Sequence, residues 1–219
     1  GGVCVISKSP TQKLEAEVVG FRDRVALLMP LDSTEGIAMG ARIDHDSHSV
    51  EVPCGPWMIG SLLNGKGELL SNAPTDLNFN FRDESRAVKS AALTPLNRRS
   101  ISERLDVGVR ALDFTIPMGL GQRIAVMAAS GVGKSILMGM IARQSKADVN
   151  VIALIGERGR EVTEFLERDL GPEGMKKSIV VSVTGDESPV LRVRGAYVAT
   201  SIAEYFRDQG LNVLLVMDS

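Results

Sequence analysis

Short apolar runs alternate with turn-forming residues through the first part of the chain. The runs are four to six residues long and predict β-strands, because apolar segments of that length between turns are typical of strands. The predicted strands are residues 3–6, 15–20, 25–29 and 49–52, separated by turns at 9–10, 22–23, 30–36 and 44–48. Short strands at this spacing predict a small antiparallel barrel or sandwich.

From residue 124 onward the pattern changes, and apolar strands alternate with amphipathic segments of helical length. Strands are predicted at 124–127, 151–155, 179–183 and 213–217, and helices at 134–145, 161–170 and 193–209. Strands that are apolar throughout predict a parallel sheet covered on both faces. The expected fold class is therefore α/β, with a parallel sheet flanked by helices and preceded by a small N-terminal β-barrel domain.

The stretch between these two patterns is polar and rich in glycine. Residues 60–72 form a glycine-rich turn pattern, and residues 72–86 form a polar, aperiodic segment that contains Pro74. We expect three parts, namely a barrel domain at 1–52, a connecting segment at 53–100 and an α/β domain at 101–219. The chain starts at Gly1 and stops directly after an apolar strand, so we expect a fragment of a longer protein.

Composition and charge limit the possible partners. The net charge is -2, so binding to nucleic acid or to anionic lipid would need a local basic patch. The two cysteines, Cys4 and Cys54, predict neither a disulfide framework nor a metal site. No leader pattern is visible, and the longest apolar runs are too short to span a bilayer. The default expectation is therefore a protein located in the reducing cytosol.

The strongest chemical signal follows the apolar run at 124–127 and opens the helix predicted at 134. Its glycines let backbone N–H groups turn toward phosphate oxygens, and the helix dipole adds favourable potential. Lys134 can reach the β- and γ-phosphates, and the Ser135 hydroxyl can ligate Mg²⁺. We expect Lys134 to face the ligand, so that its truncation costs little stability. The predicted phosphate-binding residues are Ala128, Ala129, Ser130, Gly131, Val132, Gly133, Lys134 and Ser135.

Two further signals lie at the carboxyl ends of predicted strands, where loops of an open parallel sheet line the ligand crevice. Asp218 ends the strand 213–217 and is placed to act on Mg²⁺. Glu157 and Arg158 follow the strand 151–155. A carboxylate there can polarise an attacking water, and a guanidinium can hold γ-phosphate charge. The alternative for this pair is a solvated charge cluster that caps the helix beginning at Glu161.

In their order and their residue sequences, the three motifs resemble those of the export ATPases of flagellar and type III secretion systems. These are homologues of the catalytic subunit of rotary ATP synthases. The general phosphate-loop pattern has glycine where this chain has Ala128, and the family carries alanine there too. The sequence of residues 155–161 is highly specific to this family. The resemblance covers nearly the whole chain and extends to residues 18–21, 30–37, 101–113, 121–123 and 203–210.

The resemblance implies a RecA-like ATPase domain with ATP and Mg²⁺ as ligands. It implies catalytic roles for Lys134, Glu157 and Arg158, and a metal site at Ser135 and Asp218. It also implies a hexameric ring of the full-length protein, located in the cytoplasm and peripherally at the inner face of the cytoplasmic membrane. The implied partners are the export apparatus, a stator-like regulator and chaperone–substrate complexes. The family's arginine finger and adenine-contacting aromatic are expected beyond residue 219.

The motifs are compatible with four functions, which other residues favour unequally. Residues 137–142 and 186–196 favour a flagellar export ATPase over an injectisome one. An RNA translocase needs a basic, aromatic-lined groove, whereas the first hundred residues hold eleven Lys/Arg, twelve Asp/Glu and four aromatics. We therefore predict no nucleic acid partner. Glu157 disfavours a regulatory subunit that does not turn over nucleotide, and Gly159 disfavours a proton-driven rotary synthase subunit.

Overall fold

The computed structural model describes residues 2–9, 11–46, 50–72, 79, 81–91, 94–98, 100–129 and 131–218. Pro10 of the first predicted turn, Ser49 of the predicted strand 49–52, Pro74 and Ser130 lie outside these residues. No helix in the described ranges is long and apolar enough to cross a membrane.

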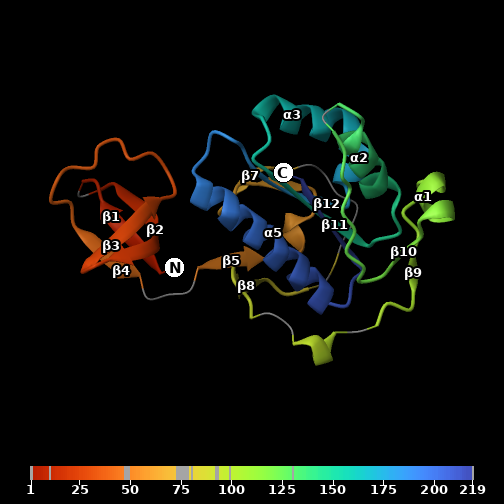
Figure 1. Cartoon of the computed structure of the whole chain (residues 1–219), viewed down its shortest axis with the longest axis horizontal. Coiled ribbons are helices and arrows are strands. Elements are labelled where there is room, and N and C mark those ends of the chain that lie inside the picture. Colours follow the sequence, from red (N-terminus) through yellow and green to blue (C-terminus); the bar gives the residue numbers. More distant parts are fainter. Residues whose placement is uncertain are drawn as a thin grey trace.

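The first four strands form one antiparallel sheet in the order β3-β2-β1-β4 (Figure 1). They are β1 (Val3–Ser7), β2 (Lys13–Arg22), β3 (Val25–Pro30) and β4 (Ile43–Asp46). Asp23 makes the tight β2–β3 turn at φ 55°, a conformation that Asp tolerates better than most residues. The predicted strands 3–6, 15–20 and 25–29 are confirmed. The described strands form a sheet with β3 and β4 at its edges, and closure into a barrel stays a prediction.

The main sheet has the order β13-β11-β12-β6-β7. Its three long strands, all parallel, are β11 (Val149–Ile155), β12 (Ser178–Val183) and β13 (Val213–Asp218). β6 (Ser61–Leu63) continues the parallel set beside β12, and β7 (Leu69–Asn72) pairs antiparallel with β6. Nearly all of β11 and all of β12 are buried, as expected for strands covered on both faces.

Helices cover both faces of this sheet (Figure 1). One face carries α2 (Lys134–Gln144), α3 (Gly159–Glu164), a π-helical segment (Phe165–Leu170) and α4 (Gly171–Met175). The other face carries α5 (Pro189–Asp208). Alternate residues of β11 serve the two layers, since Ile152 packs under α2 whereas Val151 packs under α5. The predicted helices are confirmed, but the second is divided between α-helical and π-helical turns.

Part of the predicted connecting segment belongs to the main sheet. The glycine-rich residues 60–72 form β6, a tight turn and β7 rather than a turn pattern alone. Beside them, β5 (Glu51–Cys54) pairs with β8 (Glu84–Ala87), and short 3₁₀ turns lie at Pro56–Met58 and Pro95–Asn97. This strand depends on a tertiary contact, because β6 has only three residues and is stabilised by pairing with β12. The domain boundaries themselves stay a prediction.

The strand predicted at 124–127 is absent from the described structure, and that prediction is wrong. Residues 122–129 have no regular structure, and Met127 is 90% exposed. A β-strand needs a hydrogen-bonded neighbour, and in the described chain β13 pairs with β11 alone. Immediately before this segment lie α1 (Arg110–Thr115) and the short ladder of β9 (Arg104–Leu105) with β10 (Met118–Gly119).

Candidate nucleotide-binding site

The start of α2 is preceded by two glycines in left-handed conformations. Gly131 has φ 79° and Gly133 has φ 99°, values that residues with a side chain rarely adopt. Space around both Cα atoms is open, so the backbone there is accessible to a ligand. Val132, Ala128 and Ala129 are exposed along the same stretch, and Ser130 lies outside the described residues. Gly133 caps α2 without a side-chain hydrogen bond, which leaves N–H groups for an anion.

Lys134 and Asp218 meet at the carboxyl edge of the sheet. The Lys134 ammonium donates to a carboxylate oxygen of Asp218 at 2.5 Å, although the two residues are 84 positions apart. The Asp218 side chain is only 6% exposed, whereas that of Lys134 is 31% exposed. The hydrogen bond to Asp218 raises the pKa of Lys134, and the nearby charge of Glu157 raises it further. The lysine of the loop is therefore held as a cation beside the buried carboxylate.

Glu157 lies next to this pair, one residue beyond Gly156 at the end of β11. Burial raises the pKa of the Glu157 carboxyl, and a hydrogen bond with Glu161 and the charge of Asp218 raise it further. Lys134 acts in the opposite direction. The same hydrogen bond lowers the pKa of Glu161, so it acts on the two carboxyls in opposite directions. A carboxyl tuned in this way is suited to accept and hold a proton.

The Arg158 side chain is exposed and pairs with Glu161 rather than joining Lys134 and Asp218. Its side chain is 72% exposed and forms an ion pair with Glu161 at 3.7 Å. The structure thus brings together Lys134, Asp218 and Glu157, and within the described chain it does not add Arg158 to them.

The donor set fits a magnesium ion bound together with phosphate. The Ser135 hydroxyl follows Lys134 in the first turn of α2, and Asp218 supplies a carboxylate. Among the described residues no group of three or more His, Cys, Asp or Glu side chains could hold a metal. Mg²⁺ requires no such group, because it keeps several waters and binds through one or two protein oxygens plus substrate phosphates. Ser135 and Asp218 are the residues that would hold it.

Sequence reasoning missed Glu161 as a member of the site. Its position four residues after Glu157 was the available signal, because that spacing brings two side chains together around a helix start.

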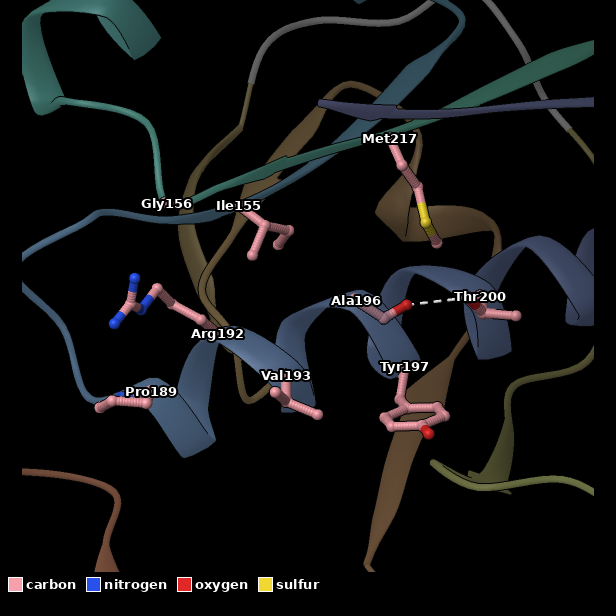
Figure 2. Close-up of a pocket in the computed structure, with 9 residues that line it drawn as sticks. All are labelled: Ile155, Gly156, Pro189, Arg192, Val193, Ala196, Tyr197, Thr200 and Met217. Atoms are coloured by element: carbon pink, nitrogen blue, oxygen red, sulfur yellow. Dashed lines mark hydrogen bonds between the residues drawn. The ribbon is translucent and has the colours of Figure 1, made fainter. Parts of the chain in front are cut away.

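Sequence reasoning also missed a cleft of about 750 Å³ between α5 and the end of the sheet (Figure 2). It runs from Gly156 and Arg192 along α5 to Thr200, under Met217. This cleft opens on the face opposite α2 and is lined mainly by apolar side chains.

The fold and the site define a class of protein. A parallel sheet whose carboxyl edge carries a glycine loop, a lysine at a helix start and an acidic strand end is typical of nucleotide-binding α/β proteins. Residues 108–219 match the nucleotide-binding domain of the ATP synthase alpha/beta family. The chain belongs to that family.

Several curated relatives are similar over the whole chain. A flagellum-specific ATP synthase of Treponema pallidum is 46% identical over 220 residues, and one of Bacillus subtilis is 47% identical over 223 residues. A type 3 secretion system ATPase of Xanthomonas euvesicatoria is 45% identical over 221 residues. All three alignments cover 100% of this chain and 48%, 50% and 49% of the relatives. The chain thus spans about half the length of the curated relatives it matches.

Solved structures show the same fold. The assembled ATPase EscN from the enteropathogenic E. coli type III secretion system has a TM-score of 0.82 and 36% identity, covering 100% of this chain and 55% of that one. EscN in complex with its central stalk EscO gives the same TM-score and identity, with 56% of that chain covered.

Proposed function

We propose that this chain is the N-terminal, nucleotide-binding half of an ATPase that energises protein export through a flagellar apparatus. The observation that carries the proposal is the meeting of Lys134, Asp218 and Glu157 at the carboxyl edge of the sheet. Similarity to proteins named flagellum-specific ATP synthase supports the flagellar assignment. The alternative is an injectisome type III secretion ATPase, which similarity to the Xanthomonas protein and to EscN supports.

The proposed substrate is ATP with Mg²⁺, which when bound neutralises phosphate charge and orients the γ-phosphate. On ATP binding, the Lys134 ammonium exchanges part of its contact with Asp218 for the β- and γ-phosphates. Backbone N–H groups of residues 128–135 hold the phosphate oxygens. Glu157 accepts the proton of the attacking water, and its raised pKa places proton transfer closer to neutral pH than for an ordinary carboxylate. Arg158 reaches the γ-phosphate after leaving its ion pair with Glu161.

The wider assignments are part of the same proposal. We assign a RecA-like sheet and a closed N-terminal barrel to the complete protein, and a hexameric ring as its working form. EscN, described as assembled and as bound to a central stalk, is a similar protein with partners of that kind. The proposed partners are the export apparatus, a stator-like regulator and chaperone–substrate complexes. The proposed location is the cytoplasm, with peripheral association at the inner face of the cytoplasmic membrane.

The test is protein export by cells whose only copy of the full-length protein carries Glu157→Gln. The expected result is loss of flagellar proteins from the culture medium at an unchanged cellular level of the variant. The control is Glu164→Gln in α3, because Glu164 is exposed. Normal flagellar export by the Glu157 variant would contradict the proposal. Normal flagella combined with lost injectisome secretion would instead support the alternative.

A further inference from the structure

The N-terminal sheet packs against the segment that supports Glu157. Leu31 directly follows β3, is 1% exposed, and forms one buried apolar cluster with Val183 and Leu191. Val183 is the last residue of β12, and Leu191 lies in the first turn of α5. Ile155, two residues before Glu157, packs against this cluster and is directed toward α5 in Figure 2. The residue that follows the N-terminal sheet thus packs beside the strand end that precedes Glu157.

Two ion pairs hold Leu31 in this place. The Arg194 side chain, 8% exposed on α5, donates to Glu15 of β2 at 3.2 Å. Lys66, in the β6–β7 turn, pairs with Asp32 at 2.7 Å. Leu31 is itself tied to the first of these pairs, because its N–H donates to the carbonyl of Glu15 at 3.0 Å. The contact between the two sheets is therefore built from apolar packing flanked by charges.

The other side of the cluster is joined to the backbone of Glu157. The carbonyl of Val183 accepts the N–H of Gly156 at 2.6 Å, and the carbonyl of Glu157 accepts the N–H of Gly185 at 3.1 Å. Gly185 also lies so close to Gly156 that a β-carbon on it would stand 3.0 Å from the Gly156 carbonyl oxygen. Residues 183–185 thus contact Leu31 through the Val183 side chain and the Glu157 segment through backbone hydrogen bonds.

We infer that Leu31 is a positioning residue for Glu157, acting from the N-terminal sheet through Val183 and Gly185. The inference rests on the proposed function. Removing most of the Leu31 side chain leaves a cavity behind Val183, and a packed interior fills a cavity by shifting its neighbours. A shift of residues 183–185 would move the Glu157 backbone with them, because Val183 and Gly185 are hydrogen-bonded to Gly156 and Glu157. Displacing a reacting group by ~1 Å can cost ~10²-fold in rate, so a smaller shift predicts a loss of about tenfold.

The ATP-binding side of the site is insulated from this shift. Lys134 and Ser135 stand on α2, which packs on the opposite face of the sheet through Met138 and Ala142. The inference therefore predicts a selective effect, with kcat lowered and the KM for ATP little changed. A general loss of folding would instead lower the amount of active enzyme and leave the KM and the kcat per folded site unchanged.

The experiment compares three variants of the full-length protein by steady-state phosphate release per folded site. Leu31→Ala is expected to lower kcat about tenfold with KM within twofold of wild type. The matched control is Leu14→Ala, because Leu14 is equally buried but packs with Ile6 and Ala16 inside the N-terminal sheet. Leu31→Met, which conserves volume, is expected to restore kcat to within twofold of wild type.

Equal kcat for Leu31→Ala and wild type, or equal losses in Leu31→Ala and Leu14→Ala, would overturn the inference. Failure of the proposed function gives a different result, because the wild-type protein itself would then release no phosphate from ATP, or Glu157→Gln would be as active as wild type.

Discussion

The two ends of β11 use polar side chains in opposite ways. At the amino end, Asn150 is buried and its amide donates to the carbonyl of Ala142 at 2.7 Å and to the hydroxyl of Ser178 at 3.1 Å. That hydroxyl donates in turn to the carbonyl of Gly174 at 2.6 Å. At the carboxyl end, the interacting groups are charged: Lys134 pairs with Asp218, and Glu157 is influenced by Glu161, Asp218 and Lys134.

The difference distinguishes polar side chains that stabilise the fold from polar side chains that can bind a ligand. At the amino end, neutral donors satisfy backbone carbonyls at the end of α2 and in α4, which fixes the helices on the strands. At the carboxyl end, charged groups are paired with each other beside an open loop, so a charged ligand can replace those contacts. Substitutions at the two ends should therefore separate turnover from stability.

The largest effect is expected for Lys134→Ala, which should reduce ATP turnover of the full-length protein to background. The structure corrects the expectation of a small stability cost, because the truncation leaves the buried Asp218 carboxylate unpaired. The free energy of unfolding should fall by about 1–3 kcal/mol. Phosphate release and urea unfolding measure the two quantities.

Adding Asp218→Asn to that variant sharpens the test. The double variant should regain part of the lost stability, since no buried charge remains, and should stay inactive. Turnover by Lys134→Ala within threefold of wild type would contradict the assignment of the loop.

The next largest effect is expected for Glu157→Gln, which should retain ATP binding and lower kcat by ~10²–10⁴, the usual value of general-base assistance. The amide has nearly the same shape but is a poor proton acceptor. Binding of a fluorescent ATP analogue and single-turnover hydrolysis measure the two steps separately. An unchanged kcat would make Glu157 a capping residue of α3.

At the amino end, Asn150→Ala should lower the free energy of unfolding by about 1–3 kcal/mol, because the Ala142 carbonyl loses its buried donor. The kcat per folded molecule should stay within twofold of wild type. Thermal unfolding combined with phosphate release at a temperature where the variant is folded tests both parts. A large loss of kcat would break the distinction between the two ends of β11.

The smallest effect is expected on the pH dependence of kcat. Glu157 works as a base only when ionised, so kcat should rise with pH, and its raised pKa places the rise above the ordinary glutamate range. Glu161→Gln removes a carboxylate that stabilises the protonated form of Glu157, so the rise should move to lower pH. Glu164→Gln is the control and should leave the profile in place. A profile unaffected by Glu161→Gln would separate Glu161 from the site.

The local features of this protein could be predicted from residues that are close together in the chain. The strands β11 and β12 and the helix α5 follow from apolar periodicity, which depends on neighbours along the chain. The glycine loop before α2 follows from Gly131, Gly133 and Lys134, because left-handed glycines before a helix start are specified within a few residues. The positions of Glu157 and Asp218 follow from the rule that parallel strands end on one edge.

Features that need a distant partner in the chain became clear only in the folded protein. Residues 61–63 are a strand because β12 lies beside them, and residues 124–127 are not one because no described strand does. The pairing of Lys134 with Asp218 and the packing of Leu31 behind Glu157 join segments that are far apart in the chain. Such contacts depend on how sheets and helices stack, which the pattern of a single segment does not encode.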